Sequence, residues 1–510
     1  LWVNAGPRWH HLSMSHELYN IGHLYEAAYA HFSATGKRNL FNVALKNADL
    51  IARTFGPGKN LNPPGHQIIE TGLIKLYQVT KDKKYLNLAK FFLDQRGNAK
   101  GHELYGTHSQ DHLPVIEQEE AVGHAVRAAY MYAGMADIAA IMNDLDYLKT
   151  VDKLWKNVVE KKLYITGGFG SIHEDESFGD EYELPNLTSY NETCAAIASV
   201  YWHHRMFLLH GDAKYLDVLE RTLYNGMLCG VSLNGDSFFY PNCMESDGKF
   251  EFNHGSLTRQ PWFDCACCPS NVIRFLPSVP DYIYAHRNDS LYINLFIANK
   301  ARIRMQKVSI NIEQESDYPW DGNVKILLNP ETQVSFSLNL RIPGWAADKP
   351  LPCNLYQYLD NHPESIILKL NSQVIDFTIE KGFAVIDRTW SRGDVIELSI
   401  PMPVRRVLAN EKVKDDRNKV ALVRGPIVYC AEWLDNGGTA LDIVLRDNVG
   451  FTVEPRKDLL GGVTVIKAEA LNPFGEKRKM VAIPYYAWSH RGPGEMTVWL
   501  MRNSNLSGLC

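Results

Sequence analysis

The sequence predicts a multidomain α + β protein, with a helical domain over residues 1–285 and an all-β region over residues 286–510. Apolar residues recur at helical spacing through the first part. Near residue 286 the pattern changes to the alternation of β-strands, punctuated by Pro, Gly, Asn and Asp. The chain has 510 residues, well above the ~250–300 at which a single core stops growing, so we expect at least two domains.

The helical domain is predicted to consist of antiparallel hairpins. A weak internal repeat runs through it, in which a helix ends, a short polar turn follows, and an aromatic or Leu pair opens the next helix. Short turns force consecutive helices to run antiparallel, and hairpins that repeat in this way indicate an α/α toroid around a central cavity. The stretches with helical spacing are Leu18–Phe32, Phe41–Phe55, Ile68–Tyr77, Ala121–Met142, Tyr147–Val158 and Cys194–Leu209.

The region from residue 286 is predicted to form one or two β-sandwich modules, because short strands are separated by turn residues. It shows no catalytic constellation, so we expect the chemistry in the helical domain. Its polar tail, Arg502–Cys510, is expected to fray. The predicted strands include Ser290–Phe296, Val334–Ile342, Ile366–Leu370, Val395–Ile400 and Lys419–Ala431.

The composition excludes several classes of function. A net charge of −5 does not favour a nucleic-acid or anionic-membrane partner. No apolar run approaches the ~18 residues of a membrane-spanning helix. Nine cysteines in 510 residues do not make a disulfide framework. The chain begins Leu1-Trp2-Val3, without Met or a signal peptide, so its start does not indicate a compartment.

The most unusual stretch is Phe263–Ser270, where Cys265, Cys267 and Cys268 fall within four positions. Pro269 follows, and the pattern predicts a helix that starts here with Pro269 at its first position. Thiols at a helix N-terminus have lowered pKa values, because the helix dipole and the free N–H groups favour the thiolate. Such thiolates serve as nucleophiles or as metal ligands.

A second cluster lies upstream of these thiols. Taken alone, Ser189 and Glu192 have the spacing of a capping box, and Cys194 starts an Ala-rich helix, so both Glu192 and Cys194 have an ordinary structural interpretation. Combined with the cysteine pair, they would complete a tetrahedral zinc site of one oxygen and three sulfurs. The predicted ligands are Glu192, Cys194, Cys267 and Cys268, with Cys265 as a competitor.

The spacing of these ligands differs from that of a zinc finger or ribbon, where paired Cys-x₂-Cys knuckles recur. A structural zinc and a catalytic zinc both remain open at this point. An acidic loop, His173–Glu181, follows the glycine-rich stretch Gly167–Ser171, and no Lys-Ser/Thr pair follows the glycines, which excludes a phosphate loop. The loop is interpreted either as a solvated segment or as the source of a general acid/base carboxylate.

Three histidines share a local pattern. His23, His66 and His124 each follow a glycine and lie in or before a predicted helix. In a toroid, helix starts on one rim line the mouth of the cavity, so these side chains could converge on one ligand. Each histidine alone has a structural interpretation as well.

Seven short motifs connect these observations: Gly65-His66, Gly123-His124-Ala125-Val126-Arg127-Ala128, Leu184-Pro185-Asn186, Glu192-Thr193-Cys194-Ala195, Cys267-Cys268-Pro269, Arg341-Ile342-Pro343-Gly344-Trp345 and Arg491-Gly492-Pro493-Gly494-Glu495-Met496. Together they resemble glycoside hydrolase family 127, the β-L-arabinofuranosidases that use a zinc-bound cysteine, or a close sibling family. The resemblance covers nearly the whole chain and is most specific between residues 17 and 275.

The resemblance implies an (α/α)6 barrel followed by β-sandwich domains. The chain before His23 is shorter than a complete barrel requires, so the barrel is expected to be N-terminally incomplete. The resemblance further implies Zn2+ bound by the four predicted ligands, with Cys267 as the nucleophile. By its position before Leu184-Pro185-Asn186, Glu176 matches the family's acid/base, with Glu174 as a nearby competitor. The residues that match sugar-contacting positions are His23, His66, His124 and Tyr240.

On this basis the expected activity is that of a retaining exo-glycoside hydrolase, which releases terminal β-L-arabinofuranose or a related sugar from plant glycans or glycoproteins. The Cys267 sulfur would attack the anomeric carbon while Glu176 protonates the leaving oxygen, and Glu176 would then activate water. The first alternative is a non-catalytic glycan-binding protein with a structural zinc–thiolate site. A second is a sugar epimerase or an unsaturated-uronyl hydrolase on an α/α barrel, which would not need the thiols.

The sequence also bears on origin and assembly. Asn191-Glu192-Thr193 is a glycosylation sequon at the predicted metal ligand, which disfavours a eukaryotic secreted origin. We therefore expect a bacterial protein of the cytoplasm or periplasm. A homodimer is compatible with the sequence.

Overall fold

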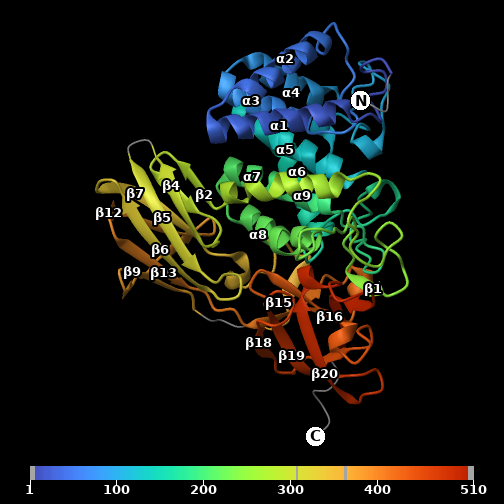
Figure 1. Cartoon of the computed structure of the whole chain (residues 1–510), viewed down its shortest axis with the longest axis vertical. Helices are drawn as coiled ribbons and strands as arrows, with labels where there is room; N and C mark the ends of the chain where they lie inside the picture. The colour runs from blue at the N-terminus through green and yellow to red at the C-terminus, as the bar shows by residue number, and fades with distance from the viewer. Residues whose placement is uncertain (1–5, 306–307, 361–364, 504–510) are drawn as a thin grey trace. The chain divides into compact units, whose positions relative to one another are not determined.

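The structure, a computed structural model, describes residues 6–305, 308–360 and 365–503 (Figure 1). Most of the predicted tail, residues 504–510, lies outside the described residues. The chain divides into two compact units. Unit 1 comprises Leu1–Lys162, Phe169–Glu181 and Tyr201–His210, and unit 2 comprises Leu163–Gly168, Tyr182–Val200 and Gly211–Cys510.

Unit 1 is built from helical hairpins, as the repeat predicts (Figure 1). Its helices are α1 (Glu17–Thr35), α2 (Asn39–Thr54), α3 (Ile69–Thr80), α4 (Lys83–Gln95), α5 (Ala125–Met142) and α6 (Leu145–Lys161), followed by the last part of α7 (Thr193–His210). Helix α1 packs against α2 and α3, α3 against α4 and α5, and α5 against α6. The core between them is fully buried and aromatic-rich, with Tyr25, Phe41, Phe92 and Tyr132 at 0% exposure.

Residue chemistry at the helix ends explains the predicted turns. Helix α1 ends at Gly36, whose φ of 71° lies in the left-handed region that glycine adopts without steric cost. Asp82 and Asp144 cap α4 and α6, and each accepts a hydrogen bond from the backbone N–H two residues further on. The turns that the sequence predicts after α1, α3 and α5 are therefore confirmed.

Unit 2 begins with the first part of α7 and continues with α8 (Lys214–Arg221), a π-helical turn (Thr222–Met227) and α9 (Cys267–Phe275). The predicted helix start at the cysteine pair is confirmed, but the predicted position of Pro269 is wrong. Helix α9 begins at Cys267, so Pro269 is its third residue. Proline is tolerated there because N–H groups of the first turn have no intrahelical partner.

Two sheets of unit 2 share one hydrophobic core, which confirms a β-sandwich. The strand order is β10-β9-β13-β6-β5-β4 in one sheet and β11-β12-β7-β3-β2 in the other. Ile326 and Ile396 from the first sheet and Leu338 and Trp390 from the second are fully buried in this core. The strands are β2 (Tyr284–Arg287), β3 (Ser290–Ile293), β4 (Asn299–Arg304), β5 (Ser309–Ser316), β6 (Asn323–Pro330), β7 (Val334–Arg341), β9 (Ile367–Leu370), β10 (Gln373–Val374), β11 (Thr378–Glu380), β12 (Phe383–Trp390) and β13 (Asp394–Ser399).

The second β module closes into a barrel, whereas the sequence predicted one or two sandwich modules. Strand β16 pairs with both β20 and β15, so the path β16-β20-β19-β17-β22-β15 returns to its start. Closure removes the exposed strand edges within the ring. The strands are β1 (Glu245–Asp247), β8 (Tyr356–Tyr358), β14 (Val404–Ala409), β15 (Lys419–Arg424), β16 (Ile427–Glu432), β17 (Val444–Arg446), β18 (Thr452–Arg456), β19 (Val463–Leu471), β20 (Lys477–Pro484), β21 (Glu495–Thr497) and β22 (Trp499–Asn503).

Strands from distant parts of the chain extend this barrel. Strand β1, from the predicted helical domain, pairs with β21, and β8, which precedes the last sandwich strands, pairs with β14. The predicted fold class, a helical domain followed by β domains, is confirmed. Among the residues that the structure describes, no helix is both long enough and apolar enough to cross a membrane.

A buried ion-pair network attaches the sandwich to α8 within unit 2. The Arg341 guanidinium, 0% exposed, lies 2.7 Å from Asp217 Oδ1 and 3.0 Å from Glu220 Oε2. Glu220 also accepts hydrogen bonds from Tyr318 (2.6 Å) and from the Trp345 indole (3.2 Å). The motif that begins at Arg341 therefore serves to dock the two parts of this unit.

Replacing Arg341 by Ala is expected to lower the free energy of unfolding by about 3–5 kcal/mol, because it leaves the buried Glu220 carboxylate and the partly buried Asp217 carboxylate without their counter-charge. Arg302 supplies a matched control, since its ion pair with Glu331 joins side chains that are 62% and 48% exposed. Arg302→Ala should cost no more than about 1 kcal/mol. Chemical denaturation of both variants checks this, and similar losses would contradict the docking role of Arg341.

Candidate active site

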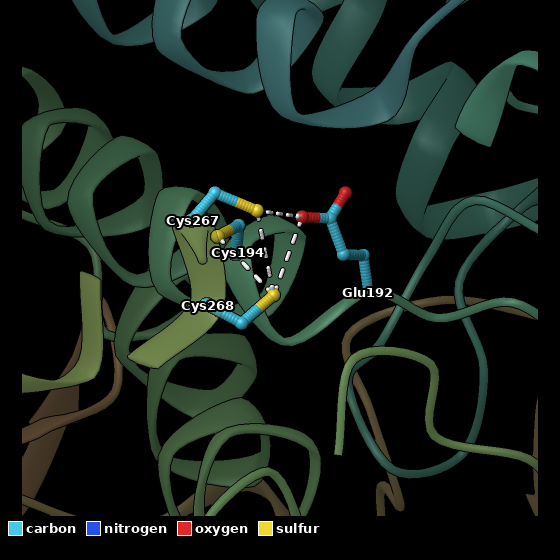
Figure 2. Close-up of side chains that lie close together, drawn as sticks. All are labelled: Glu192, Cys194, Cys267 and Cys268. Carbon is cyan, nitrogen blue, oxygen red and sulfur yellow. Dashed lines mark hydrogen bonds between the residues drawn. The ribbon is translucent and has the colours of Figure 1, made fainter. Parts of the chain in front are cut away.

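Four predicted ligands come together in unit 2. The side chains of Glu192, Cys194, Cys267 and Cys268 point toward one another (Figure 2), and their ligand atoms all lie within 4.8 Å of each other. Cys268 Sγ lies 3.4 Å from Cys194 Sγ and 3.8 Å from Cys267 Sγ. Glu192 Oε1 lies 3.4 Å from Cys268 Sγ and 3.5 Å from Cys267 Sγ.

These distances fit the edges of a tetrahedral zinc site. With Zn–S bonds of about 2.3 Å and a Zn–O bond of about 2.0 Å, the edges of a tetrahedron measure about 3.8 Å between sulfurs and about 3.5 Å between sulfur and oxygen. The four separations given above, 3.4–3.8 Å, are close to these values. Cys265, the competing ligand, is exposed and is not part of the group.

The start of α7 sets the position of Glu192 and Cys194. Asn191 has φ of 44°, a left-handed conformation that Asn tolerates, and it turns the chain just before Glu192. Thr193 fastens this turn, because its N–H donates to Tyr240 O (2.9 Å) and its Oγ1 donates to Phe239 O (2.8 Å). Since α7 begins at Thr193, the capping-box interpretation of Glu192 is wrong.

The first turn of α9 supplies the other two thiols. Cys267 and Cys268 are its first two residues, where the helix dipole and unpaired N–H groups stabilise negative charge on sulfur. Cys268 is fully buried, whereas Cys267 is partly accessible. Of the pair, only Cys267 therefore combines a place in the ligand group with access from outside.

The charge balance of this group favours a divalent cation. Burial raises the pKa of the Cys268 thiol well above its ordinary value, and the neighbouring thiols act in the same direction. Burial also tends to raise the pKa of the Cys194 thiol, but its hydrogen bonds with Cys267 and Cys268 outweigh burial and lower that pKa. Three sulfurs and a carboxylate cannot all carry negative charge in a buried site unless a cation offsets their repulsion and desolvation.

Tyr240, predicted from the resemblance to contact the sugar, lies against the partly accessible thiol. Its hydroxyl is 2.9 Å from Cys267 Sγ. The ring is held in place by Phe263 and His254, with centroid distances of 5.4 Å and 4.4 Å. As a thiol, Cys267 donates a hydrogen bond to the Tyr240 hydroxyl; as a thiolate, its sulfur would accept one from that hydroxyl.

The predicted histidines gather in unit 1. The His66 ring lies 5.6 Å from the His124 ring and 4.4 Å from the Tyr19 ring, and Tyr19 lies 4.6 Å from His23. Burial lowers the pKa of His124 and lowers that of His66 well below its usual value. These two rings are therefore neutral near pH 7, which suits them to exchange hydrogen bonds with sugar hydroxyls.

The acidic loop brings one carboxylate to this group. Glu176 Oε2 lies 2.8 Å from His124 Nε2, whereas Glu174 is exposed. Asp175 and Glu176 have φ of 57° and 53°, a conformation that costs non-glycine residues of order 1–3 kcal/mol each and that is typical of functional sites. Of the two candidate acids, Glu176 is the one with a buried histidine partner.

Sequence reasoning missed several members of this cluster. His16 lies 5.6 Å from His66, and His108 lies 5.4 Å from His124 between ring centroids. Burial lowers the pKa of His108 to about 4. Arg127 donates to Gly65 O (2.9 Å) and Ser109 Oγ (2.8 Å), so it connects loops that carry the histidines. Only Arg127 had a signal in the sequence, because it belongs to the motif that starts at Gly123.

A further motif residue, Asn186, fixes the chain ahead of the predicted zinc ligands in unit 2. Its Nδ2 donates to Asp416 Oδ1 (2.8 Å), and its backbone carbonyl accepts from Met244 N (3.1 Å). Burial raises the pKa of Asp416 to about 7. Asn186 thus holds the segment before α7 against the C-terminal barrel and does not join the ligand group.

Comparison with known families accounts for nearly the whole chain. Residues 1–281 match the β-L-arabinofuranosidase GH127 catalytic domain, residues 290–402 match the GH127 middle domain, and residues 404–501 match the glycoside hydrolase family 127 C-terminal domain. A non-reducing end β-L-arabinofuranosidase of Bifidobacterium longum is 35% identical, over 98% of this chain and 81% of its own.

Solved structures of proteins from the same family are also similar to this chain. A GH127 β-arabinofuranosidase is 50% identical, with a TM-score of 0.91 over 98% of this chain and 78% of that chain. A GH127 β-L-arabinofuranosidase from Geobacillus stearothermophilus is 41% identical, with a TM-score of 0.89 over 98% of this chain and 82% of that chain.

Proposed function

Because the chain belongs to glycoside hydrolase family 127 and is thus a glycoside hydrolase, we propose that it releases terminal β-L-arabinofuranose from plant-derived glycans with retention of configuration. The observation that carries the proposal is the convergence of three thiols and one carboxylate at the starts of α7 and α9. A polysaccharide-binding role without catalysis would need neither an accessible thiol nor a tyrosine hydroxyl directed at it.

We propose that Glu192, Cys194, Cys267 and Cys268 bind zinc. When bound, zinc keeps the thiols deprotonated at neutral pH and moderates the charge of the attacking sulfur. The residues of the chain do the remaining work. The α9 N-terminus stabilises sulfur anions, and Tyr240 orients the Cys267 sulfur through its hydroxyl.

In the first step, the Cys267 sulfur forms a bond to the anomeric carbon while the bond from that carbon to the leaving oxygen breaks. Glu176, as a carboxylic acid, gives its proton to the leaving oxygen. The product of this step is a thioglycosyl-enzyme on Cys267 together with the released alcohol.

In the second step, the Glu176 carboxylate takes a proton from water, and the water oxygen forms a bond to the anomeric carbon. The carbon–sulfur bond breaks, which restores the Cys267 thiolate and the Glu176 acid. Two inversions give net retention. We propose that His23 and His66 bind the sugar hydroxyls in both steps.

A panel of aryl glycosides together with metal analysis tests this function. The purified protein should hydrolyse the β-L-arabinofuranoside at least about 100-fold faster than the α-L-arabinofuranoside, because the thiolate attacks from one face of the anomeric carbon. It should also contain about one zinc ion per chain. Zinc without hydrolysis of any glycoside on the panel would support the non-catalytic alternative.

A further inference from the structure

We propose that His124 is a positioning residue, which holds the acid/base Glu176 through its Nε2–H group. The proposal rests on the proposed function, in which Glu176 is the acid/base. It assigns to His124 a role beyond the sugar contact which the family resemblance implies for this position. Four features of unit 1 lead to it.

The first feature is the place of His124 at the N-cap of α5. Its Nδ1 accepts a hydrogen bond from the backbone N–H of Arg127 at 3.4 Å. A ring nitrogen that accepts a hydrogen bond carries no proton. In a neutral imidazole the single proton must then lie on Nε2, so helix capping fixes the tautomer of this ring.

The second feature is that the surroundings keep this ring neutral. Burial lowers the pKa of His124, Glu176 acts in the opposite direction, and Arg127 again lowers it. If Nδ1 carried a proton, its N–H would face the backbone N–H of Arg127, and two donors cannot form a hydrogen bond with each other. It would also place positive charge at a helix N-terminus, which the helix dipole disfavours.

The third feature is the attachment of the acidic loop to the start of α5. Nε2 of His124 lies 2.8 Å from Glu176 Oε2, with the ring as donor and the carboxylate as acceptor. The backbone of the loop is pinned beside it, because Ser177 forms a β-bridge with His124 and Phe178 N donates to Gly123 O (2.9 Å). The side-chain contact and the backbone contacts therefore act together to hold Glu176 in its left-handed conformation.

This attachment has a chemical consequence for the acid. An oxygen that accepts a hydrogen bond is best kept unprotonated, so the bond from His124 to Oε2 favours the acid proton on Oε1 of Glu176. The proton to be donated thus has a defined place on the carboxyl group. A general acid that delivers its proton from one oxygen in one orientation needs this kind of preorganisation.

The fourth feature is the contrast with the neighbouring His66. Its Nδ1 lies 2.9 Å from the Gln67 carbonyl oxygen, which can only accept, so Nδ1 carries the proton. The two rings, with centroids 5.6 Å apart, therefore have opposite tautomers. Nε2 of His66 is an acceptor available to a sugar hydroxyl, whereas the Nε2–H of His124 is already engaged by Glu176.

Two substitutions of His124 separate its roles. In His124→Asn, the amide lies near the place of Nδ1, so it can cap α5 but cannot reach Glu176. In His124→Gln, the amide reaches the place of Nε2 and can donate to Glu176, but it caps poorly. Values of kcat/KM are measured for both variants and for Glu176→Gln on 2,4-dinitrophenyl and methyl β-L-arabinofuranosides, since only the methyl leaving group needs a proton.

We expect His124→Asn to lose at least about 10-fold more in kcat/KM on the methyl glycoside than on the dinitrophenyl glycoside. His124→Gln should keep the wild-type ratio between the substrates and should melt at a lower temperature. Equal losses of His124→Asn on both substrates, while Glu176→Gln still discriminates between them, would overturn the positioning role alone. Equal losses of Glu176→Gln on both would overturn the acid/base assignment and this inference with it.

Discussion

Replacing Cys267 by Ser is expected to lower kcat/KM on aryl β-L-arabinofuranosides by about 10⁴-fold or more. A serine hydroxyl is a far weaker nucleophile than a thiolate, because it keeps its proton at neutral pH. The variant should remain folded, because Cys267 is the partly accessible member of the group and the change is a single atom. Steady-state kinetics with circular dichroism on the same sample measures both effects.

Cys265 is the matched control for this substitution. It lies two residues before Cys267, is exposed, and is not part of the ligand group. Cys265→Ser should keep kcat/KM within about twofold of the wild type, as is usual for exposed sites away from the chemistry. Near-native activity of Cys267→Ser, or a loss in Cys265→Ser as deep as that in Cys267→Ser, would contradict the assignment of the nucleophile.

Removal of the metal is expected to have the second largest effect, a loss of at least about 100-fold in kcat, together with a lower melting temperature. Without a cation, burial favours protonated thiols, as the raised pKa of Cys268 indicates, and the attacking sulfur is no longer a thiolate. A ligand whose free concentration is about 1,000 times its Kd stabilises the folded protein by about 4 kcal/mol, and this contribution is lost as well.

The experiment compares protein treated with a chelator, protein treated with the same chelator presaturated with zinc, and chelated protein to which one equivalent of Zn2+ is returned. Only the first sample should lose activity, and the third should regain it. Cys268→Ala should reproduce the loss, because Cys268 is a buried member of the group with no access to substrate. Full activity in protein shown to be free of metal would exclude a catalytic zinc.

Much of the fold could be predicted from local sequence chemistry. The helix ends at Gly36, Asp82 and Asp144 follow from capping preferences that act within one turn. The closed β-barrel could not be predicted in this way. Closure depends on the pairing of β15 with both β16 and β22, and alternation along a strand does not reveal how many neighbours the strand has.

The candidate site, too, could be predicted from the sequence only in part. The grouping of Glu192 with three cysteines was predictable from ligand chemistry, since one oxygen and three sulfurs make a complete zinc set. The roles within the group came from the family resemblance and stay predictions. The structure adds what spacing could not provide, namely that Cys268 is buried, that Cys267 is partly accessible, and that Tyr240 lies against Cys267.

The link between His124 and Glu176 shows why some site features are beyond sequence reasoning. The two residues are 52 positions apart, and their contact depends on a left-handed turn at Asp175 and Glu176, a conformation that is uncommon for residues other than glycine. The tautomer of His124 depends in turn on the exact start of α5, which the helical periodicity placed at Ala121 and the structure places at Ala125. Helix boundaries are set by caps, and periodicity alone locates them poorly.

Mass spectrometry of the Cys267 peptide during turnover tests most directly whether a thioglycosyl-enzyme forms on Cys267. The Glu176→Gln variant is mixed with 2,4-dinitrophenyl β-L-arabinofuranoside and quenched with acid. The activated leaving group needs no proton, whereas hydrolysis of the intermediate needs the missing base, so the intermediate should accumulate. The peptide with Cys267 should gain the mass of one anhydropentose on its sulfur; an unmodified Cys267, or the sugar on another side chain, would contradict the role of Cys267 as nucleophile.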